Sequence, residues 1–228
     1  MKNIKIEDKR ELRSHINHIN SIENQIPIGF NNGDCFEYIE SKNLELRYFE
    51  SFFSFDECEK YIEELNQKVE WKNEVVNVWG KKISLKRRTS WYGDIGKEYT
   101  YSGLTVKALG WNSILLKIKK KIEEASSNVF NSVLLNDYSS GDIGMGWHSD
   151  DEKELGKNPV IASVSFGAER DFYLRHKKIK DLDNIHMKLK NGSLLLMLSE
   201  TQHHWEHSIP KRLKVKNQRI NLTFRKIS

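Results

Sequence analysis

A histidine and an aspartate stand two positions apart in GMGWHSDDE, residues 144–152, as His148 and Asp150. A second stretch, HHWEHSIP, supplies three more imidazoles, at His203, His204 and His207. Two neutral imidazoles and one carboxylate on one face of an ion suit non-haem Fe(II) and leave positions open for a co-substrate and O₂. The same atoms also suit zinc hydrolysis, and an H-x-D triplet often occurs by chance in a surface loop.

A strand-like stretch near the end of the chain places charged side chains on one face. In RINLTFRKI, residues 219–227, a two-residue period separates apolar residues from Arg219, Asn221, Thr223 and Arg225. In LLNDY the same period groups Leu134, Asn136 and Tyr138. Two guanidiniums on one face suit a solvent-exposed strand, but inside a barrel they suit an anionic ligand. They favour an oxygenase that consumes the dicarboxylate 2-oxoglutarate over a hydrolase, which needs no such anchor.

The composition bounds the partners and the compartment. The 228 residues carry 37 Lys and Arg against 32 Asp and Glu, a formal net charge of +5. The basic clusters at 81–88, 117–121 and 210–216 suit a nucleic-acid surface and equally suit solvated loops and helix faces. Two cysteines are too few for a disulfide framework, and no apolar run approaches the ~20 residues that span a bilayer. We expect a soluble, intracellular monomer without a membrane segment, in the nucleus of a eukaryote or the cytoplasm of a bacterium.

The chain begins with a polar segment, followed by a strand and two helices. Residues 1–43 are predicted to be a polar N-terminal extension and residues 44–228 the folded domain. LELRYFESF, from residue 44, alternates like a strand, and Ser54 with Glu57 predicts a capping box at a helix start. That helix has a buried stripe of Cys58, Tyr61, Ile62, Leu65 and Val69. A second helix is predicted over 111–125, with its buried face formed by Trp111, Ile114, Leu115, Ile118 and Ile122.

The rest of the chain, from about residue 128, consists of short β-rich runs separated by Gly, Asn, Asp and Pro. Asn191-Gly192 between two of these runs predicts a two-residue hairpin. The fold class expected is α+β and mostly β, a double-stranded β-helix or jelly roll with helices packed on one side.

The order of motifs from about residue 71 to 227 resembles the AlkB family of Fe(II)/2-oxoglutarate dioxygenases, in its eukaryotic-type DNA-repair branch. The stretches that carry the resemblance are SWYGDIG and YTYSGL (90–104), VLLNDYSSGDIGMGWHSDDEKEL (133–155), PVIASVSFGAERDFYLRHK (159–177), GSLLLML (192–198), HWEHSIP (204–210) and RINLTFRKI (219–227). The span over which these motifs follow one another, about residue 71 to 227, covers over half of the chain.

The resemblance implies roles for the residues in these motifs. It makes His148, Asp150 and His207 the iron ligands, with His203 and His204 as neighbours. The 2-oxoglutarate contacts it implies are Asn136, Tyr138, Arg219, Asn221 and Arg225, all of which belong to the two faces that strand alternation groups. We expect Arg225 to hold the distal carboxylate of 2-oxoglutarate and Arg219 to lie nearer the metal.

The activity implied is oxidative demethylation of 1-methyladenine and 3-methylcytosine in DNA with Fe(II), O₂ and 2-oxoglutarate, releasing formaldehyde, succinate and CO₂. Three alternatives stay open: the same chemistry on RNA or a protein side chain, a nucleic-acid-binding module without turnover, and a zinc hydrolase. The last two are disfavoured, because a pure binder needs neither ligand triad nor arginine pair and a hydrolase needs no dicarboxylate anchor.

A base inside a duplex cannot reach a buried metal, so the nucleotide is single-stranded or flipped out. By resemblance, residues 71–106 form a nucleotide-recognition hairpin lid. Tyr101 and His148 would flank the base, with Tyr99 and Glu152 along its edge and Asp151 beside it. Ordinary aromatic packing is the alternative for the two tyrosines.

The tip of the predicted lid, NVWGKK, matches the family's hairpin that probes duplex DNA. Trp79 would fill the gap left by the flipped base, and Arg87 with Arg88 would hold phosphates; a hairpin tip packed on the body is the alternative. Trp79 replaces the commoner Phe, Glu206 stands where Tyr is usual, and Thr89 replaces an amide. These departures bear on strand preference, on DNA against RNA, and on lesion range.

Overall fold

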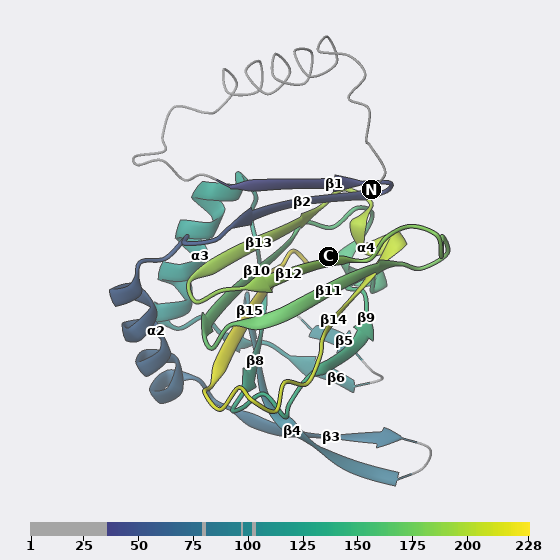
Figure 1. The fold of residues 1–228 in the computed structure, drawn as a ribbon. Coiled ribbons are helices and arrows are strands. Elements are labelled where there is room, and N and C mark those ends of the chain that lie inside the picture. Colours follow the sequence, from purple (N-terminus) through teal and green to yellow (C-terminus); the bar gives the residue numbers. More distant parts are fainter. Residues whose placement is uncertain (1–35, 79–80, 97, 102–103) are drawn as a thin grey trace. The chain divides into compact units, whose positions relative to one another are not determined.

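The computed structural model describes residues 36–228 except 79–80, 97 and 102–103 (Figure 1). In this part of the chain the strands form a large sheet, a four-stranded sheet and a short hairpin, all mostly antiparallel. This arrangement of facing antiparallel sheets confirms the predicted β-rich jelly roll. It also brings polar and apolar side chains of both larger sheets to one space between them.

The large sheet runs in the order β1-β2-β13-β10-β15-β8-β4-β3, and β7 pairs with β4 in parallel. Its members are β1 (Glu37–Ser41), β2 (Leu44–Phe49), β3 (Lys72–Val78), β4 (Lys81–Gly93), β7 (Leu109–Gly110), β8 (Ser132–Tyr138), β10 (Ile161–Gly167), β13 (Ser193–Leu198) and β15 (Arg219–Arg225). The central strand β15 pairs with β10 on one side and β8 on the other. Every residue of β15 is buried, so both of its faces are covered.

The four-stranded sheet runs in the order β12-β11-β14-β9. Its strands are β9 (Met145–His148), β11 (Arg170–His176), β12 (Ile185–Leu189) and β14 (Trp205–Ile209). The remaining pair is β5 (Glu98–Tyr101) with β6 (Leu104–Lys107). Buried residues of the two larger sheets, among them Ile161, Phe172, Leu174, Leu195 and Ile209, form one apolar cluster between those sheets.

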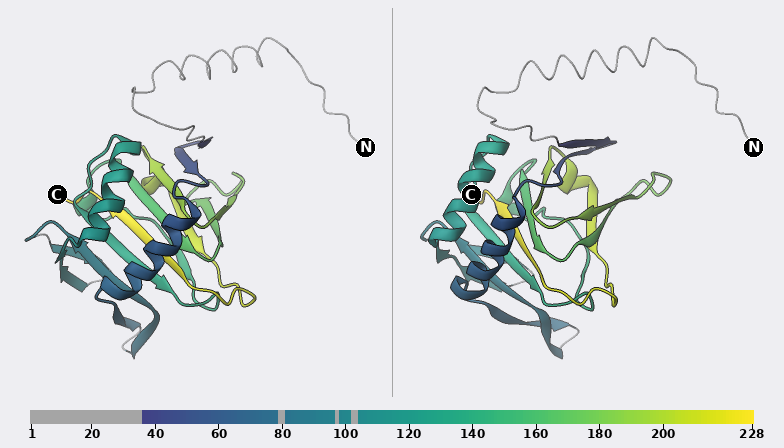
Figure 2. Two further views of the ribbon diagram at one scale, coloured as in Figure 1. Left: turned by 90° about the vertical axis from the view of Figure 1, so that its left-hand side faces the viewer. Right: turned by 60° about the vertical axis from the view of Figure 1, so that its left-hand side comes forward.

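Two helices, α2 (Phe55–Lys68) and α3 (Ser113–Ser126), lie across one face of the large sheet (Figure 2). Ser54 and Glu57 form the predicted capping box at the start of α2. Leu65 of α2 and Ile118 of α3 pack with Val164 and Leu222 in a second apolar cluster. A short 3-10 helix, η1 (Lys153–Leu155), and a single turn, α4 (Thr201–His204), complete the elements. Within residues 36–228 as described, each helix falls short of the length and apolar character that crossing a bilayer requires.

The turn at Asn191-Gly192 differs from the prediction, because it does not close a hairpin. β12 before it pairs with β11, whereas β13 after it pairs with β10 and β2, so the turn passes the chain from one sheet to the other. Gly192 has a φ of 78°, and its backbone N–H donates to Ser165 O. A two-residue turn signal therefore marked a tight turn correctly but not its partners.

Two predicted boundaries also differ from the structure. β1 pairs with β2 along its whole length, so strand pairing begins before residue 44. The predicted lid, 71–106, is in part a strand of the large sheet, because residues 88–93 of β4 pair with β8. Only the outer part of the β3–β4 hairpin projects from the sheet (Figure 1).

Gly192→Ala is expected to destabilise the protein by about 1–3 kcal/mol, because a side chain here is strained at positive φ and meets packed atoms. An added Cβ would lie 2.6 Å from Phe53 O and 2.7 Å from Cys58 Sγ. Gly110→Ala is the control, since its Cβ would meet open space, and we expect a change within about 0.5 kcal/mol. Urea unfolding followed by circular dichroism measures both; equal stabilities would contradict the strained turn.

Candidate metal and co-substrate site

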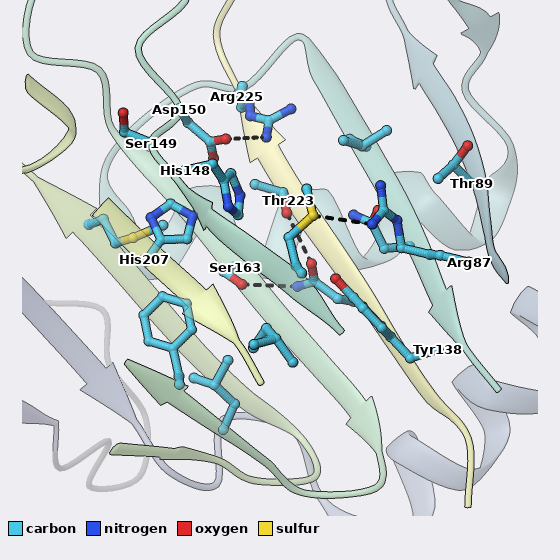
Figure 3. Close-up of a pocket in the computed structure, with 18 of the residues that line it drawn as sticks. Arg87, Thr89, Tyr138, His148, Ser149, Asp150, Ser163, His207, Thr223 and Arg225 are labelled. Atoms are coloured by element: carbon cyan, nitrogen blue, oxygen red, sulfur yellow. Dashed lines mark hydrogen bonds and ion pairs between the residues drawn. The ribbon is translucent and has the colours of Figure 1, made fainter. Parts of the chain in front are cut away.

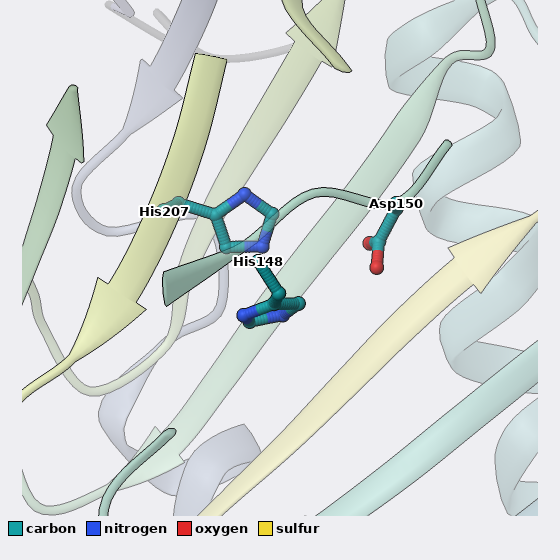
Figure 4. Close-up of side chains that lie close together, drawn as sticks. All are labelled: His148, Asp150 and His207. Carbon is teal, nitrogen blue, oxygen red and sulfur yellow. The ribbon is translucent and has the colours of Figure 1, made fainter. Parts of the chain in front are cut away.

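His148, Asp150 and His207 come together at the end of β9, in the loop that follows it, and on β14 (Figure 4). Their possible ligand atoms lie within 4.8 Å of one another. His148 and His207 are opposite each other in the pairing of β9 with β14, and their ring centroids are 4.3 Å apart. Antiparallel pairing thus brings together two imidazoles that are far apart in the sequence, as the triad hypothesis requires.

The orientation of His148 suits metal binding through its other ring nitrogen. Nδ1 lies 2.9 Å from the Gly146 carbonyl oxygen, to which it donates as the Nδ1–H tautomer. Such a bond fixes the ring and leaves Nε2 as the ligand atom. His207 packs against Phe172, with ring centroids 5.3 Å apart.

The protonation states of Asp150 and His207 also suit a metal. Burial raises the pKa of Asp150, but Arg225 and the two histidines outweigh it and hold that pKa below its ordinary value. Burial, helped by His148, lowers the pKa of His207 to about 3. At neutral pH the site therefore offers a carboxylate and a neutral imidazole, the forms that bind metal. Two imidazoles and one carboxylate, mostly buried, fit the donor set of non-haem Fe(II).

Gln202 holds the loop that carries Asp150, a role that sequence reasoning did not predict. Its side-chain Oε1 accepts a hydrogen bond of 2.9 Å from the backbone N–H of Asp150, and its amide Nε2 lies 3.3 Å from Met197 Sδ. Lys177 adds a second tie, since its Nζ donates to Asp151 and to the Gln202 carbonyl oxygen. Gln202 and Asp150 are 52 positions apart in the sequence, which explains why spacing did not reveal this contact.

A cavity of about 200 Å³ extends from the metal ligands between the two larger sheets (Figure 3). The polar residues that line it include all four of the predicted inward face of β15 together with Asn136 and Tyr138 of β8. Strand alternation therefore predicted this face of both strands correctly. Apolar walls come from Leu134, Met145, Phe172, Leu189, Met197 and Ile209.

Arg219 is a buried guanidinium with unused donors. It is 1% exposed, and its Nη2 donates to Ser165 Oγ over 2.9 Å. Among the described residues, its Nε and Nη1 have no hydrogen-bond acceptor and no carboxylate forms an ion pair with it. Burial lowers the pKa of Arg219 to about 10, so it stays charged at neutral pH. A buried charge without a counterion is costly, and a ligand carboxylate would supply that counterion.

The two arginines of β15 lie in the reverse of the order we predicted. Arg225 Nη2 is 2.8 Å from Asp150 Oδ1, so Arg225 is at the metal end. Arg219 is paired with Tyr138 at the other end of the strand, roughly 20 Å along the backbone. Alternation gives the face of a side chain but not which end of the strand meets the metal loop, and that depends on where the loop after β9 folds. The expectation that Arg219 lies nearer the metal ligands than Arg225 is therefore wrong.

Some of the residues predicted to contact the nucleic acid line the cavity, and others do not. Arg87 and Glu152 line the cavity, and neither Arg87 Nε nor Glu152 Oε2 has a hydrogen-bond partner in the described part of the chain. Arg87 is buried and its Nη1 contacts Met145 Sδ, so it does not present an exposed surface to phosphates. Asp151 does not line the cavity, and its carboxylate pairs with Lys177.

Arg88, also predicted to hold phosphates, pairs instead with Asp137 and lies over the ring of Trp71. Thr89 lines the cavity. Trp79 lies outside the described residues. Tyr99 and Tyr101 belong to β5, but the positions of their side chains are outside the described structure.

Three residues near His207 point away from the cavity. His203 Nε2 accepts a hydrogen bond from the Asn158 backbone N–H. His204 Nε2 lies 3.7 Å from Glu200 Oε2. Glu206 alternates with His207 along β14 and pairs with Arg175. The departure from the family pattern at Glu206 therefore lies outside the metal site.

Comparisons with known proteins agree with this geometry. The model of the 2OG-Fe(II) oxygenase superfamily matches residues 45–225. The chain is 38% identical to mouse (Mus musculus) "DNA oxidative demethylase ALKBH2", over 90% of this chain and 91% of that protein. It is 37% identical to the bovine (Bos taurus) "Alpha-ketoglutarate-dependent dioxygenase alkB homolog 3", over 77% of this chain and 64% of that protein.

A solved structure, "The structure of OsALKBH1", is similar in fold, with a TM-score of 0.62 and 16% identity over 84% of this chain and all of that one. At this identity the likeness concerns the fold alone. The family match spans both the candidate metal ligands and the inward face of β15. The chain belongs to the 2OG-Fe(II) oxygenase superfamily and, within it, to the AlkB family, whose members use Fe(II), 2-oxoglutarate and O₂.

Proposed function

We propose that this protein repairs DNA by oxidative demethylation of N-alkylated bases, 1-methyladenine and 3-methylcytosine among them. The observation that carries the proposal is a cavity with a His–Asp–His group at one end and, at the other, a buried guanidinium that has no ion-pair partner among the described residues. The names of the mouse and bovine relatives support a DNA demethylase and a 2-oxoglutarate-dependent oxygenase.

The metal site would be formed by His148, Asp150 and His207. Fe(II), when bound, supplies the redox chemistry that couples decarboxylation of 2-oxoglutarate to hydroxylation of an N-methyl group. Arg225 keeps Asp150 ionised and in place, and Gln202 fixes its backbone. These contacts orient the ligands before the metal arrives, which is how surrounding hydrogen bonds tune metal sites.

Arg219 is the residue we assign to the distal carboxylate of 2-oxoglutarate. Its free donors suit a bidentate carboxylate contact. Asn136 Oδ1 also lacks a hydrogen-bond partner among the described residues, whereas Asn221 is held by Ser163 and Val164. Asn221 thus shapes the cavity, while Tyr138 and Asn136 remain candidates for direct contact.

The overall reaction balances without any further reactant. One oxygen atom of O₂ enters succinate as 2-oxoglutarate loses CO₂, and the other converts the N-methyl group into N-hydroxymethyl. The C–N bond of that hemiaminal then breaks, releasing formaldehyde and the unmodified base. The protein's part is to orient the methyl group towards the metal and to exclude water.

Glu152 is the candidate for recognition of a cationic base. Its buried Oε2 lacks a hydrogen-bond partner in the described structure, and it lines the cavity beside His148. Methylation at N1 of adenine or N3 of cytosine makes the base cationic, and a carboxylate at the base edge would balance this charge. The base reaches such a site only when it leaves the stack. Contacts of Trp79, Tyr99, Tyr101 and Asp151 with DNA, the monomeric state and the intracellular compartment stay predictions.

His207→Ala is expected to lower formaldehyde release from methylated oligonucleotides by at least about 1000-fold, equivalent to about 4 kcal/mol in the barrier. His203→Ala is the matched control, because its ring bonds a loop N–H outside the metal site, and it should retain activity. Single- and double-stranded DNA and RNA carrying 1-methyladenine are compared with Fe(II), O₂ and 2-oxoglutarate present. Turnover confined to RNA, or full activity in His207→Ala, would contradict the proposal.

Arg219→Met is expected to raise the KM for 2-oxoglutarate by about 30-fold or more, the equivalent of ~2 kcal/mol lost with a charged hydrogen-bonded pair. Because the guanidinium has no ion-pair partner in the described part of the chain, the variant should be at least as stable as wild type without ligand, but 2-oxoglutarate should no longer raise its Tm. Arg175→Met, on the outer face of β11, is the control. An unchanged KM would reject Arg219 as the anchor.

Glu152→Gln keeps the shape of the side chain and removes its charge. We expect kcat/KM to fall at least about tenfold for cationic 3-methylcytosine, the scale of one charged hydrogen bond, and to change much less for neutral 3-methylthymine. Steady-state formaldehyde assays on both lesions in one oligonucleotide sequence measure the difference. Equal losses on the two bases would show that Glu152 does not recognise charge.

A further inference from the structure

A second buried arginine, Arg170, lies beside the proposed co-substrate pocket. It is the first residue of β11 and 1% exposed, on the inward face that it shares with Phe172 of the cavity wall. In the described part of the chain no carboxylate forms an ion pair with it, and its Nε has no hydrogen-bond acceptor. Among the described residues, a permanent charge is therefore buried without an ion-pair partner, which is costly unless a ligand balances it.

Arg170 connects the segment that follows β8 with the segment that follows β14. Its Nη2 donates to the carbonyl oxygens of Ile143 and Pro210, both at 2.8 Å. Ile143 belongs to the loop that follows Tyr138 on β8, and Pro210 directly follows β14, which carries His207. One guanidinium therefore fixes the segment behind the co-substrate residue and the segment behind the metal ligand.

The ring of Tyr138 lies within cation–π range of two guanidiniums. The guanidinium carbon of Arg170 is 5.7 Å from the ring centroid, and that of Arg219 is 5.3 Å from it. Such contacts between an arginine and an aromatic face are attractive, and they are stronger when desolvated. They hold the ring of Tyr138 close to two positive charges.

We propose that Arg170 is a positioning residue for 2-oxoglutarate, which holds Tyr138 against Arg219 and adds a second positive charge behind the distal carboxylate. This inference rests on the proposed function, because it takes Arg219 as the anchor for that carboxylate. A neutral donor would suffice if the side chain only formed hydrogen bonds to the two carbonyl oxygens. A guanidinium also carries a charge, which in a low-dielectric interior attracts an anion over several ångströms.

The test separates charge from hydrogen bonding at one position. Arg170→Gln keeps an amide donor for the carbonyls and loses the charge, whereas Arg170→Lys keeps the charge. Binding of 2-oxoglutarate to the full chain loaded with Ni(II), which does not turn over, is measured by calorimetry, and Ni(II) binding is measured separately. We expect Arg170→Gln to weaken 2-oxoglutarate binding at least tenfold with Ni(II) affinity within twofold, and Arg170→Lys to recover most of the loss.

Two further variants complete the design. Arg175→Met, on the opposite face of the same strand, should bind 2-oxoglutarate within twofold of wild type. If Arg170 acts through Tyr138, the losses in Arg170→Gln and Tyr138→Phe should be less than additive in the double variant. In turnover, Arg170→Gln should raise the KM for 2-oxoglutarate with little change in kcat.

The outcomes distinguish this inference from the proposed function. Equal 2-oxoglutarate affinities for Arg170→Gln, Arg170→Lys and wild type would overturn the role of the charge, and parallel losses of Ni(II) and 2-oxoglutarate affinity would show a purely structural role. If Arg170→Gln does not fold, a tenfold or greater loss in Arg170→Lys overturns the inference too. Failure of wild type to bind 2-oxoglutarate would instead reject the proposed function itself.

Discussion

The ion pair between Arg225 and Asp150 is the interaction on which the site depends. Both partners are nearly fully buried, 6% and 4% exposed, with 2.8 Å between Nη2 and Oδ1. A buried carboxylate without such a partner would take up a proton, and a protonated acid is a poor metal ligand. The pair also ties the loop after β9 to the central strand β15, so the position of the third ligand follows from the sheet.

The same strand places the other end of the site. β15 pairs with β8 on one side and β10 on the other, which holds it in an extended conformation. The distance between Arg219 and Arg225 is therefore set by the rise per residue of a strand. One arginine already has a carboxylate from the protein, and the other has none among the described residues. This contrast, rather than the presence of two arginines, distinguishes the charge that organises the metal site from the charge that awaits a ligand.

Helices α2 and α3 explain how a strand so rich in polar residues is tolerated. They bury the outer face of β15, at Ile220, Leu222 and Phe224, in an apolar cluster. Burial of this face drives folding and offsets the cost of keeping guanidiniums, amides and carboxylates on the inner face. The residues of β15 that stabilise the fold and the residues that line the site therefore lie on opposite faces of the strand, because side chains alternate between the two faces.

The sequence by itself determined the faces of the strands, the capping box of α2 and the jelly-roll class, because periodicity and local hydrogen bonding act over a few residues. The choice of His207 among the three histidines at 203–207 came from the resemblance to the AlkB family, since periodicity does not distinguish them. Tertiary structure alone decided which arginine lies beside Asp150, and that the turn at Asn191-Gly192 passes the chain from one sheet to the other. It alone also decided that Arg88 pairs with Asp137. The supporting contacts of Gln202 and Arg170 are likewise visible only in the folded chain. Each of these depends on contacts across tens of residues, where strand pairing and loop paths set the distances and the sequence carries no local signal. The sequence pattern of a strand predicts which face each side chain is on, but what lies beside each end of the strand depends on the elements packed around it.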